Sequence, residues 1–260
     1  MNKRLWSVFA GLCGLLVLTL CAVPSGAQIS EVKEKPAMYS YVANWQIPRE
    51  HWADIEKSAS ARNAILEKAM ADGTIVGYGD DMNLVHQPEA ETHDNWWSAM
   101  SLAGLIKVLD QFFAADISAS PNAASPTKHW DNVYVSRYYN WKSGSWKGGY
   151  GYIAAYKLKA NAPDDAVALL SKNLVVPLLE KMLADGTILE YEIDTQAIHT
   201  EAPGMFAIVF IAPKPEGVDT VLAAIRGTQG EHPLNGPAFG SMVEDSGHRD
   251  ELMKGNGTYK

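Results

Sequence analysis

The sequence predicts an α+β fold built from two tandem copies of one unit, each with the order strand, helix, strand, strand, helix, strand. Residues 65–86 recur without a gap as residues 178–199, and eleven positions carry the same amino acid. Aromatic residues recur with a two-residue period at the start of both copies, which is typical of a half-buried strand. An internal repeat of this kind indicates a duplicated architecture.

The first copy opens with the strand alternation at residues 39–47, and a helical apolar period follows from Trp52. We expect that helix to end at Asp72-Gly73, because glycine accepts the left-handed conformation that closes a helix. Two strands, a short helix and a closing strand complete the copy, at residues 74–86, 96–102, 105–112 and 133–141.

The second copy repeats this order from a strand at residues 150–158. Its first helix should be kinked or split at Pro177, which cannot donate a backbone hydrogen bond, and should end at Asp185-Gly186. A later helix is expected to be entered through Pro215 and closed by Gly227. The remaining strands are expected at residues 187–199, 205–211 and 252–260.

The N-terminus has the pattern of a secretory signal peptide, since Lys3 and Arg4 precede an apolar run and Ala27 ends a small-residue cleavage site. We therefore expect a secreted or periplasmic protein that begins at Gln28, with no membrane span after cleavage. The expected divisions are a signal peptide at 1–27, an N-terminal segment at 28–37, a first repeat at 38–141, a linker hairpin at 142–146 and a second repeat at 147–260.

Composition narrows the range of partners. The formal net charge is −8, which disfavours nucleic acid. Both cysteines, Cys13 and Cys21, leave with the signal peptide, so the mature chain has no disulfide. The chain is 47% hydrophobic, enough for a core of its own. A small molecule is the expected partner, and a homodimer is left open.

The order of elements in each copy is that of the ferredoxin-like split βαβ unit. A tandem pair resembles the dimeric α/β-barrel superfamily, over nearly all of the mature chain. This resemblance implies two ferredoxin-like βαββαβ repeats packed as a pseudo-dimeric α/β barrel, with two sheets facing each other around a cavity. The superfamily includes cofactor-free monooxygenases, EthD-like and NIPSNAP-like proteins, chlorite dismutases and dye-decolourising peroxidases, so the fold leaves the reaction open.

One face of the second strand is polar in both copies. It carries Gly77, Gly79, Asp81 and Asn83 in the first copy and Glu190, Glu192, Asp194 and Gln196 in the second. If the apolar face packs on the helices, Asp81 and Asp194 point into the barrel, where they could bind a ligand or act as bases. The alternative is that both are ordinary surface acids.

Aromatic residues are concentrated on the proposed first strands, including Tyr41, Trp45, Tyr152 and Tyr156. Their rings offer apolar area with a polar tip, which suits a cavity for a ring-bearing or oxygenated ligand. We therefore take these four as candidate ligand-binding residues. They suit the filling of a core equally well.

A His-x-Asp pattern recurs ahead of the two closing strands, as His129 with Asp131 and His248 with Asp250. In an extended chain this spacing puts the imidazole and the carboxylate on the same side. The four residues are candidate catalytic acids and bases. The alternative is a structural staple that fixes the loop to the last strand.

These patterns favour a protein that binds a small organic ligand in a barrel cavity, with the reaction unknown. The alternatives are a cofactor-free monooxygenase or isomerase, a haem-binding barrel that would use a histidine with Arg137 or Arg226, and a structural protein of the cell envelope. No cofactor is expected outside the haem alternative. No metal site is expected either, because the loop that contains His86 and His93 lacks a metal-binding spacing.

Overall fold

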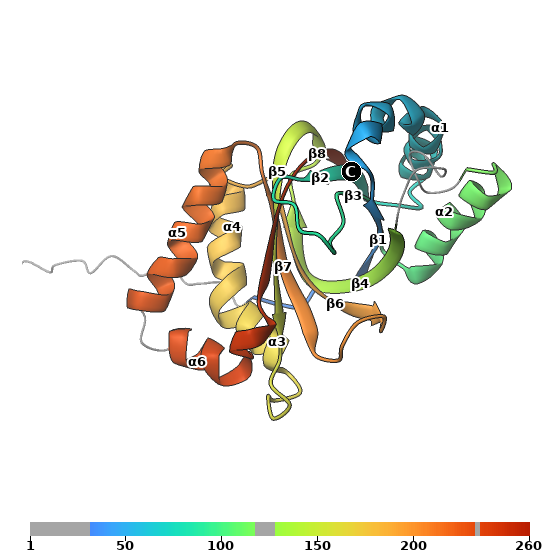
Figure 1. The fold of residues 1–260 in the computed structure, drawn as a ribbon. Coiled ribbons are helices and arrows are strands. Elements are labelled where there is room, and N and C mark those ends of the chain that lie inside the picture. The colour runs from blue at the N-terminus through green and yellow to red at the C-terminus, as the bar shows by residue number, and fades with distance from the viewer. Residues whose placement is uncertain (1–31, 118–127, 232–234) are drawn as a thin grey trace, which may run out of the picture. The chain divides into compact units, whose positions relative to one another are not determined.

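The computed structural model describes residues 32–117, 128–231 and 235–260, and residues 32–260 form one compact unit (Figure 1). The expected signal peptide and its cleavage site lie outside the described residues, as does most of the loop between residues 114 and 128. In the described part of the chain, no helix is both long enough and apolar enough to cross a membrane.

The described strands form one closed antiparallel barrel of eight strands. Around the barrel their order is β1-β3-β2-β8-β5-β7-β6-β4. Their bounds are β1 (Met38–Gln46), β2 (Gly77–Asn83), β3 (His93–Ala99), β4 (Lys128–Trp141), β5 (Gly144–Lys157), β6 (Glu190–Ile198), β7 (Met205–Ala212) and β8 (Arg249–Tyr259).

This closed barrel corrects the predicted fold class. The strands do not build two ferredoxin-like βαββαβ repeats packed as a pseudo-dimeric α/β barrel, with two sheets facing each other. Strand β2 pairs with β8, where Gly77 lies opposite Tyr259, and β4 pairs with β6, where Trp141 lies opposite Glu190. Four strands alone would leave two open edges of unpaired backbone groups, and pairing across both edges satisfies those groups.

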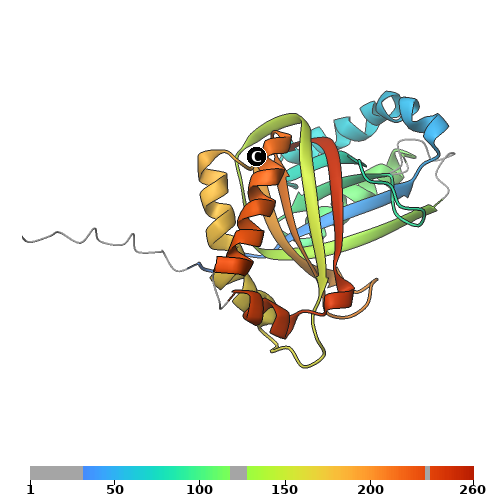
Figure 2. The ribbon, with the colours of Figure 1, turned by 60° about the vertical axis from the view of Figure 1, so that its left-hand side comes forward.

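The helices cover the outside of the barrel on two sides (Figures 1 and 2). On one side lie α1 (Trp52–Ala71) and α2 (Leu102–Ala114). On the other lie α3 (Ala166–Leu170), α4 (Val176–Asp185), α5 (Pro215–Glu231) and α6 (Asn235–Met242). The apolar cores sit between helices and strands, with Trp97 buried in one and Phe210 in the other. The barrel interior is therefore not the hydrophobic core.

The two Asp-Gly helix ends are confirmed. Gly73 has φ 81° and Gly186 has φ 87°, the left-handed conformation that glycine accepts. In each, the following threonine donates its backbone N–H and its hydroxyl to Oδ1 of the aspartate, at 2.9 and 2.6 Å. The repeated residues thus form the same helix end in both halves of the chain.

The split at Pro177 is also confirmed, since a π-helical turn at Ser171–Val175 separates α3 from α4. Gly227 does not close α5, which continues to Glu231, because a glycine within a helix costs only about 1 kcal/mol. The expected linker hairpin at 142–146 is not a hairpin: β4 and β5 do not pair, and Gly144 already pairs with β8.

Candidate functional site

The barrel encloses a cavity of about 550 Å³, within the range of small-molecule sites. Alternate residues of each strand line it, for example Ser40 and Asn44 of β1 and Trp96 of β3. At one end the lining residues reach the surface, where Glu201 and Arg249 are exposed. At the other end Tyr259 is buried and stacks on Trp141, with ring centroids 4.8 Å apart. Among the described residues, the mouth thus lies at the Arg249 end, and stacked aromatic rings close the Tyr259 end.

Two glycines make room for the side chains inside. A Cβ on Gly255 would lie 2.1 Å from Oδ1 of Asp81, and a Cβ on Gly79 would lie 2.6 Å from the ring of Trp96. Both distances are shorter than any contact that a real Cβ tolerates. The glycines of β2 and β8 thus leave the space in which Asp81 and Trp96 meet.

Asp81 and Asp94 are direct cross-strand partners on β2 and β3, and both line the cavity. Nε1–H of Trp96 donates to Oδ2 of Asp81 at 2.9 Å. Enclosure in the barrel raises the pKa of Asp81 to about 7, although the Trp96 hydrogen bond opposes the rise. Burial, and next the charge of Asp81, raise the pKa of Asp94 well above its usual range. Two acids in such different settings can divide the roles of base and hydrogen-bond donor.

Strand β6 contributes a row of three acids on its inner face, Glu190, Glu192 and Asp194. Glu192 accepts hydrogen bonds from Tyr259 Oη at 2.6 Å and from Ser40 Oγ at 3.1 Å. Burial, followed by the charge of Glu192, raises the pKa of Glu190 and Asp194 well above the usual range. Burial thus favours the protonated form of both acids.

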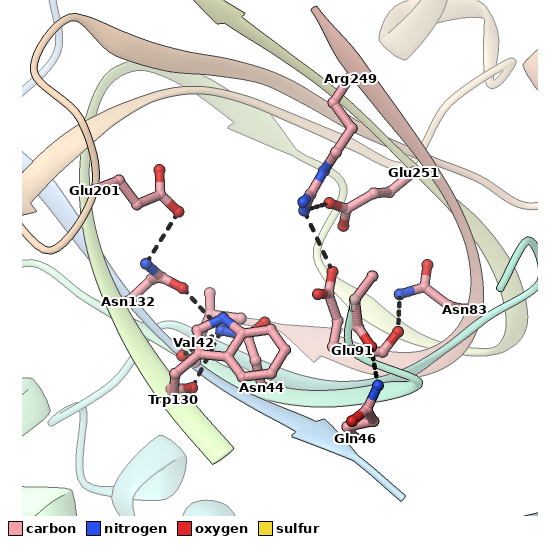
Figure 3. A network of polar contacts seen from close by, with 11 residues as sticks. Val42, Asn44, Gln46, Asn83, Glu91, Trp130, Asn132, Glu201, Arg249 and Glu251 are labelled. Carbon is pink, nitrogen blue, oxygen red and sulfur yellow. Dashed lines mark hydrogen bonds and ion pairs between the residues drawn. The ribbon is translucent and has the colours of Figure 1, made fainter. Parts of the chain in front are cut away.

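The mouth holds the polar network that Figure 3 shows. Arg249 of β8 points between Glu91 and Glu251, with Nη2 3.7 Å from Oε1 of Glu91 and a closer ion pair to Glu251. Burial, and next its proximity to Glu91, raise the pKa of Glu251 to about 8. Across the mouth, Asn132 donates to Glu201 at 3.3 Å.

The four aromatic candidates Tyr41, Trp45, Tyr152 and Tyr156 do not line the cavity; they lie on the outer face of β1 and β5. Tyr41 stacks on Trp97 with centroids 4.3 Å apart, and Tyr152 stacks on Phe210 at 5.4 Å. Trp45 is buried and the three tyrosines are partly buried in the apolar cores outside the barrel, so the predicted ligand-binding role does not match their position.

The two His-x-Asp pairs adopt the same geometry. Nε2 of His129 lies 3.3 Å from Asp131, and Nδ1 lies 2.9 Å from the carbonyl oxygen of Asn44. For His248 the corresponding distances are 3.2 Å to Asp250 and 3.1 Å to the carbonyl oxygen of Ala155.

Each ring also stacks on an aromatic residue of the neighbouring strand, His129 on Trp45 at 3.5 Å and His248 on Tyr156 at 4.4 Å. Burial lowers the pKa of His129, but the hydrogen bonds to Asp131 and to the Asn44 carbonyl outweigh it, so the pKa is raised. His248 reaches the edge of the cavity lining, whereas His129 does not. This arrangement matches the staple alternative.

Asp81 and Asp194 both line the cavity, so the polar faces of β2 and β6 point inward. The sequence reasoning missed Asp94, Trp96 and Arg249 as candidate site residues. A signal was available, because β3 and β8 show the same alternation of inward and outward residues. That alternation was applied only to the second strand of each copy.

The residues present do not fit a haem. His248 is the one histidine among the described lining residues, and both its ring nitrogens have partners. Arg137 is not in the lining, and the side chain of Arg226 lies outside the described residues. The interior acids would also repel the propionates. Within the described chain, no three His, Cys, Asp or Glu side chains are arranged to hold a metal ion.

No family model and no curated protein sequence matches this chain. Solved structures do match its fold. These matches are consistent with a fold-level resemblance to the dimeric α/β-barrel superfamily.

One similar structure is a protein from Fusobacterium nucleatum subsp. nucleatum ATCC 25586, provisionally named a monooxygenase. It has a TM-score of 0.62 and 8% identity, over 87% of this chain and 95% of that one. Another protein with the same provisional name, from Lactobacillus acidophilus NCFM, has a TM-score of 0.58 and 10% identity, over 84% and 94%. An anthrone oxidase-like protein has a TM-score of 0.51 and 8% identity, over 85% and 92%. Identities this low establish the fold alone.

Proposed function

We propose that this protein is an enzyme that binds a small, ring-bearing, oxygenated molecule inside the barrel and removes a proton from it with Asp81. The observation that carries the proposal is the setting of Asp81, which lines the cavity, accepts the Trp96 hydrogen bond and has a pKa of about 7. A base works best when its pKa is near the operating pH.

The neighbouring acids supply the second part of the chemistry. When Asp81 takes a proton from a carbon conjugated to a ring carbonyl, negative charge develops on the carbonyl oxygen. Burial and the charge of Asp81 favour the protonated form of Asp94, which can donate a hydrogen bond to that oxygen. The chain's own carboxyl groups thus suffice for the proton transfer.

Two outcomes follow from the carbanion. Return of the proton to another carbon gives an isomerisation. Reaction with O₂ at a ring methylene gives a carbonyl: one oxygen atom stays on the carbon, and the two methylene hydrogens leave with the other as water. The names of proteins with this fold, two provisional monooxygenases and an anthrone oxidase-like protein, favour the second outcome.

Anthrone tests the proposal because its methylene is such a carbon acid. In deuterated buffer without O₂, the protein should accelerate exchange of the methylene hydrogens; with O₂, it should form anthraquinone and consume one O₂ per anthrone. Asp81→Asn should slow the exchange by about 100-fold or more. Asp110→Asn removes an exposed carboxylate from α2 and serves as the control. Equal exchange by wild type and Asp81→Asn would refute the role of Asp81.

A further inference from the structure

Charge is distributed very unevenly inside the barrel. Among the described residues that line the cavity, eight carry a carboxyl group, and Arg249 is the one arginine or lysine. Arg249 lies at the mouth, where Glu91 and Glu251 already pair with it. The deeper wall, with Asp81, Asp94 and the acids of β6, therefore has no cation of its own among the described residues.

A second, independent observation is that three of these acids have an oxygen without a hydrogen-bond partner among the described residues. The atoms are Oδ1 of Asp94, Oε1 of Glu190 and Oδ1 of Asp194. The three residues are only 4%, 1% and 6% exposed, so bulk water does not serve these oxygens. A buried polar atom without a partner is costly, and a ligand that donates hydrogen bonds here removes that cost.

The walls next to these acids are aromatic. Trp96 and Tyr259 line the closed end, with ring centroids 5.4 Å apart, and Trp130 and Tyr134 line the side of the cavity. The face of an aromatic ring attracts a cation as well as another ring. An anionic ligand, by contrast, would meet carboxylates on β2, β3 and β6.

We infer that the ring-bearing ligand of this cavity also carries a positively charged nitrogen, an alkylammonium group joined to its aromatic ring by a short chain. Its ammonium group lies among these carboxyl groups, and its ring lies against Trp96 and Tyr259. This inference rests on the proposed function and names the substrate class for the same cavity. A bare metal ion fits less well, because no three of the described acids are arranged to share one.

Binding of such a cation has a distinctive proton signature. Burial and mutual repulsion raise the pKa of Glu190, Asp194 and Asp94 in the empty barrel, because both disfavour the charged forms. An ammonium group favours the ionised forms, so its arrival drives protons off the acids and into the solvent. A neutral ligand of the same shape releases none.

Three probes of similar shape test the inference by isothermal titration calorimetry at pH 6.5: tyramine, 4-ethylphenol and 3-(4-hydroxyphenyl)propanoate. Tyramine should bind at least about tenfold more tightly than 4-ethylphenol, and the propanoate should bind most weakly. Repeating the titration in buffers with different ionisation enthalpies should show proton release with tyramine alone.

Glu190→Gln and Asp194→Asn keep the size of the side chains and remove their charge. Each should weaken tyramine at least about tenfold and leave 4-ethylphenol unchanged, while Asp110→Asn, which alters the net charge equally but outside the barrel, should leave both unchanged. Equal affinities for tyramine and 4-ethylphenol, or no binding of tyramine, would overturn the inference. The anthrone exchange experiment tests the proposed function separately. If the protein prefers the cationic probe but Asp81→Asn still exchanges anthrone at the wild-type rate, the proposed function is wrong and the inference about the ligand stands.

Discussion

Asp81 differs from Asp194, its counterpart in the sequence repeat, in the neighbours that the next strand provides. Asp81 lies opposite Asp94, and Trp96 donates to it. Asp194 lies opposite Ala207, which can neither donate nor repel. Two aspartates at equivalent positions thus have different chemistry, and only Asp81 combines a hydrogen-bond donor with a second acid across the strand.

The first prediction concerns pH and stability. The pKa of Asp81 is raised from 3.8 to about 7 in the folded state. The contribution of Asp81 to the wild-type free energy of unfolding is therefore greatest below pH 3.8 and decreases as the pH rises to 7. Asp81→Asn carries no such penalty. Between these pH values the free energy of unfolding of the variant should therefore rise relative to that of wild type, by up to about 4 kcal/mol. The difference should level off above pH 7. Denaturant unfolding of both proteins across pH 4–8 measures it.

The second prediction separates the staple from a site at the histidines. His129→Ala and His248→Ala should each lower the free energy of unfolding by about 1–2 kcal/mol, since each loses a ring stack and two hydrogen bonds. Ligand binding should not change. A variant that loses binding or turnover while its melting temperature is preserved would show instead that the pair belongs to the site.

At the scale of elements, the two halves fill the barrel in complementary ways. In the first half, β2 presents small residues such as Gly79 and β3 presents large polar ones such as Trp96. In the second half, β6 presents Glu190 and Glu192, and β7 presents Ala207, Val209 and Ile211. Large side chains thus alternate with small ones between neighbouring strands, which leaves a cavity while the acids project into it.

The third prediction tests this fit between strands. Gly255→Ala should destabilise the protein by about 3 kcal/mol, because the added Cβ would strike the carbonyl oxygen of Asp80 at 2.0 Å and Asp81 at 2.1 Å. The control is Gly240→Ala in α6, where nothing lies within 4 Å and alanine should stabilise by about 0.5–1 kcal/mol. Thermal unfolding compares them, and equal stability of the two variants would count against the close packing around Asp81.

Part of this architecture can be predicted from the sequence because it is local. The Asp-Gly helix ends, the split at Pro177 and the inward polar face that carries Asp81 all depend on short-range periodicity and backbone preference. The closure of the barrel depends instead on pairs such as Trp141 with Glu190, which are distant in sequence. The prediction that Tyr41, Trp45, Tyr152 and Tyr156 line the cavity was wrong for a related reason. Alternation shows that the two faces of a strand differ, but not which face points into a polar cavity.

At the scale of the whole molecule, the barrel keeps its apolar cores outside, under the helices, and its acids inside. The net charge of −8 therefore reflects the site as well as the surface. Repulsion among the interior acids lowers the stability of the empty protein, and a cationic ligand relieves it. The same groups that cost stability thus provide selectivity.

The fourth prediction concerns the mature chain. We propose that the protein is exported and cleaved after Ala27, as the charged start, apolar run and small-residue site indicate. Intact-mass measurement of protein recovered from the producing cells should give a chain that begins at Gln28. Recovery of a chain that retains Met1, or one with a lipid on Cys21, would contradict it.

The central claim is that Asp81 is a base inside the barrel that titrates near neutral pH. Carbon-13 NMR of the side-chain carboxyl groups tests it most directly, with the Asp81 signal assigned by its loss in Asp81→Asn. We expect its titration midpoint near pH 7, shifted downward by tyramine. A midpoint near 3.8, with or without tyramine, would show that Asp81 is an ordinary solvated carboxylate and would contradict the account.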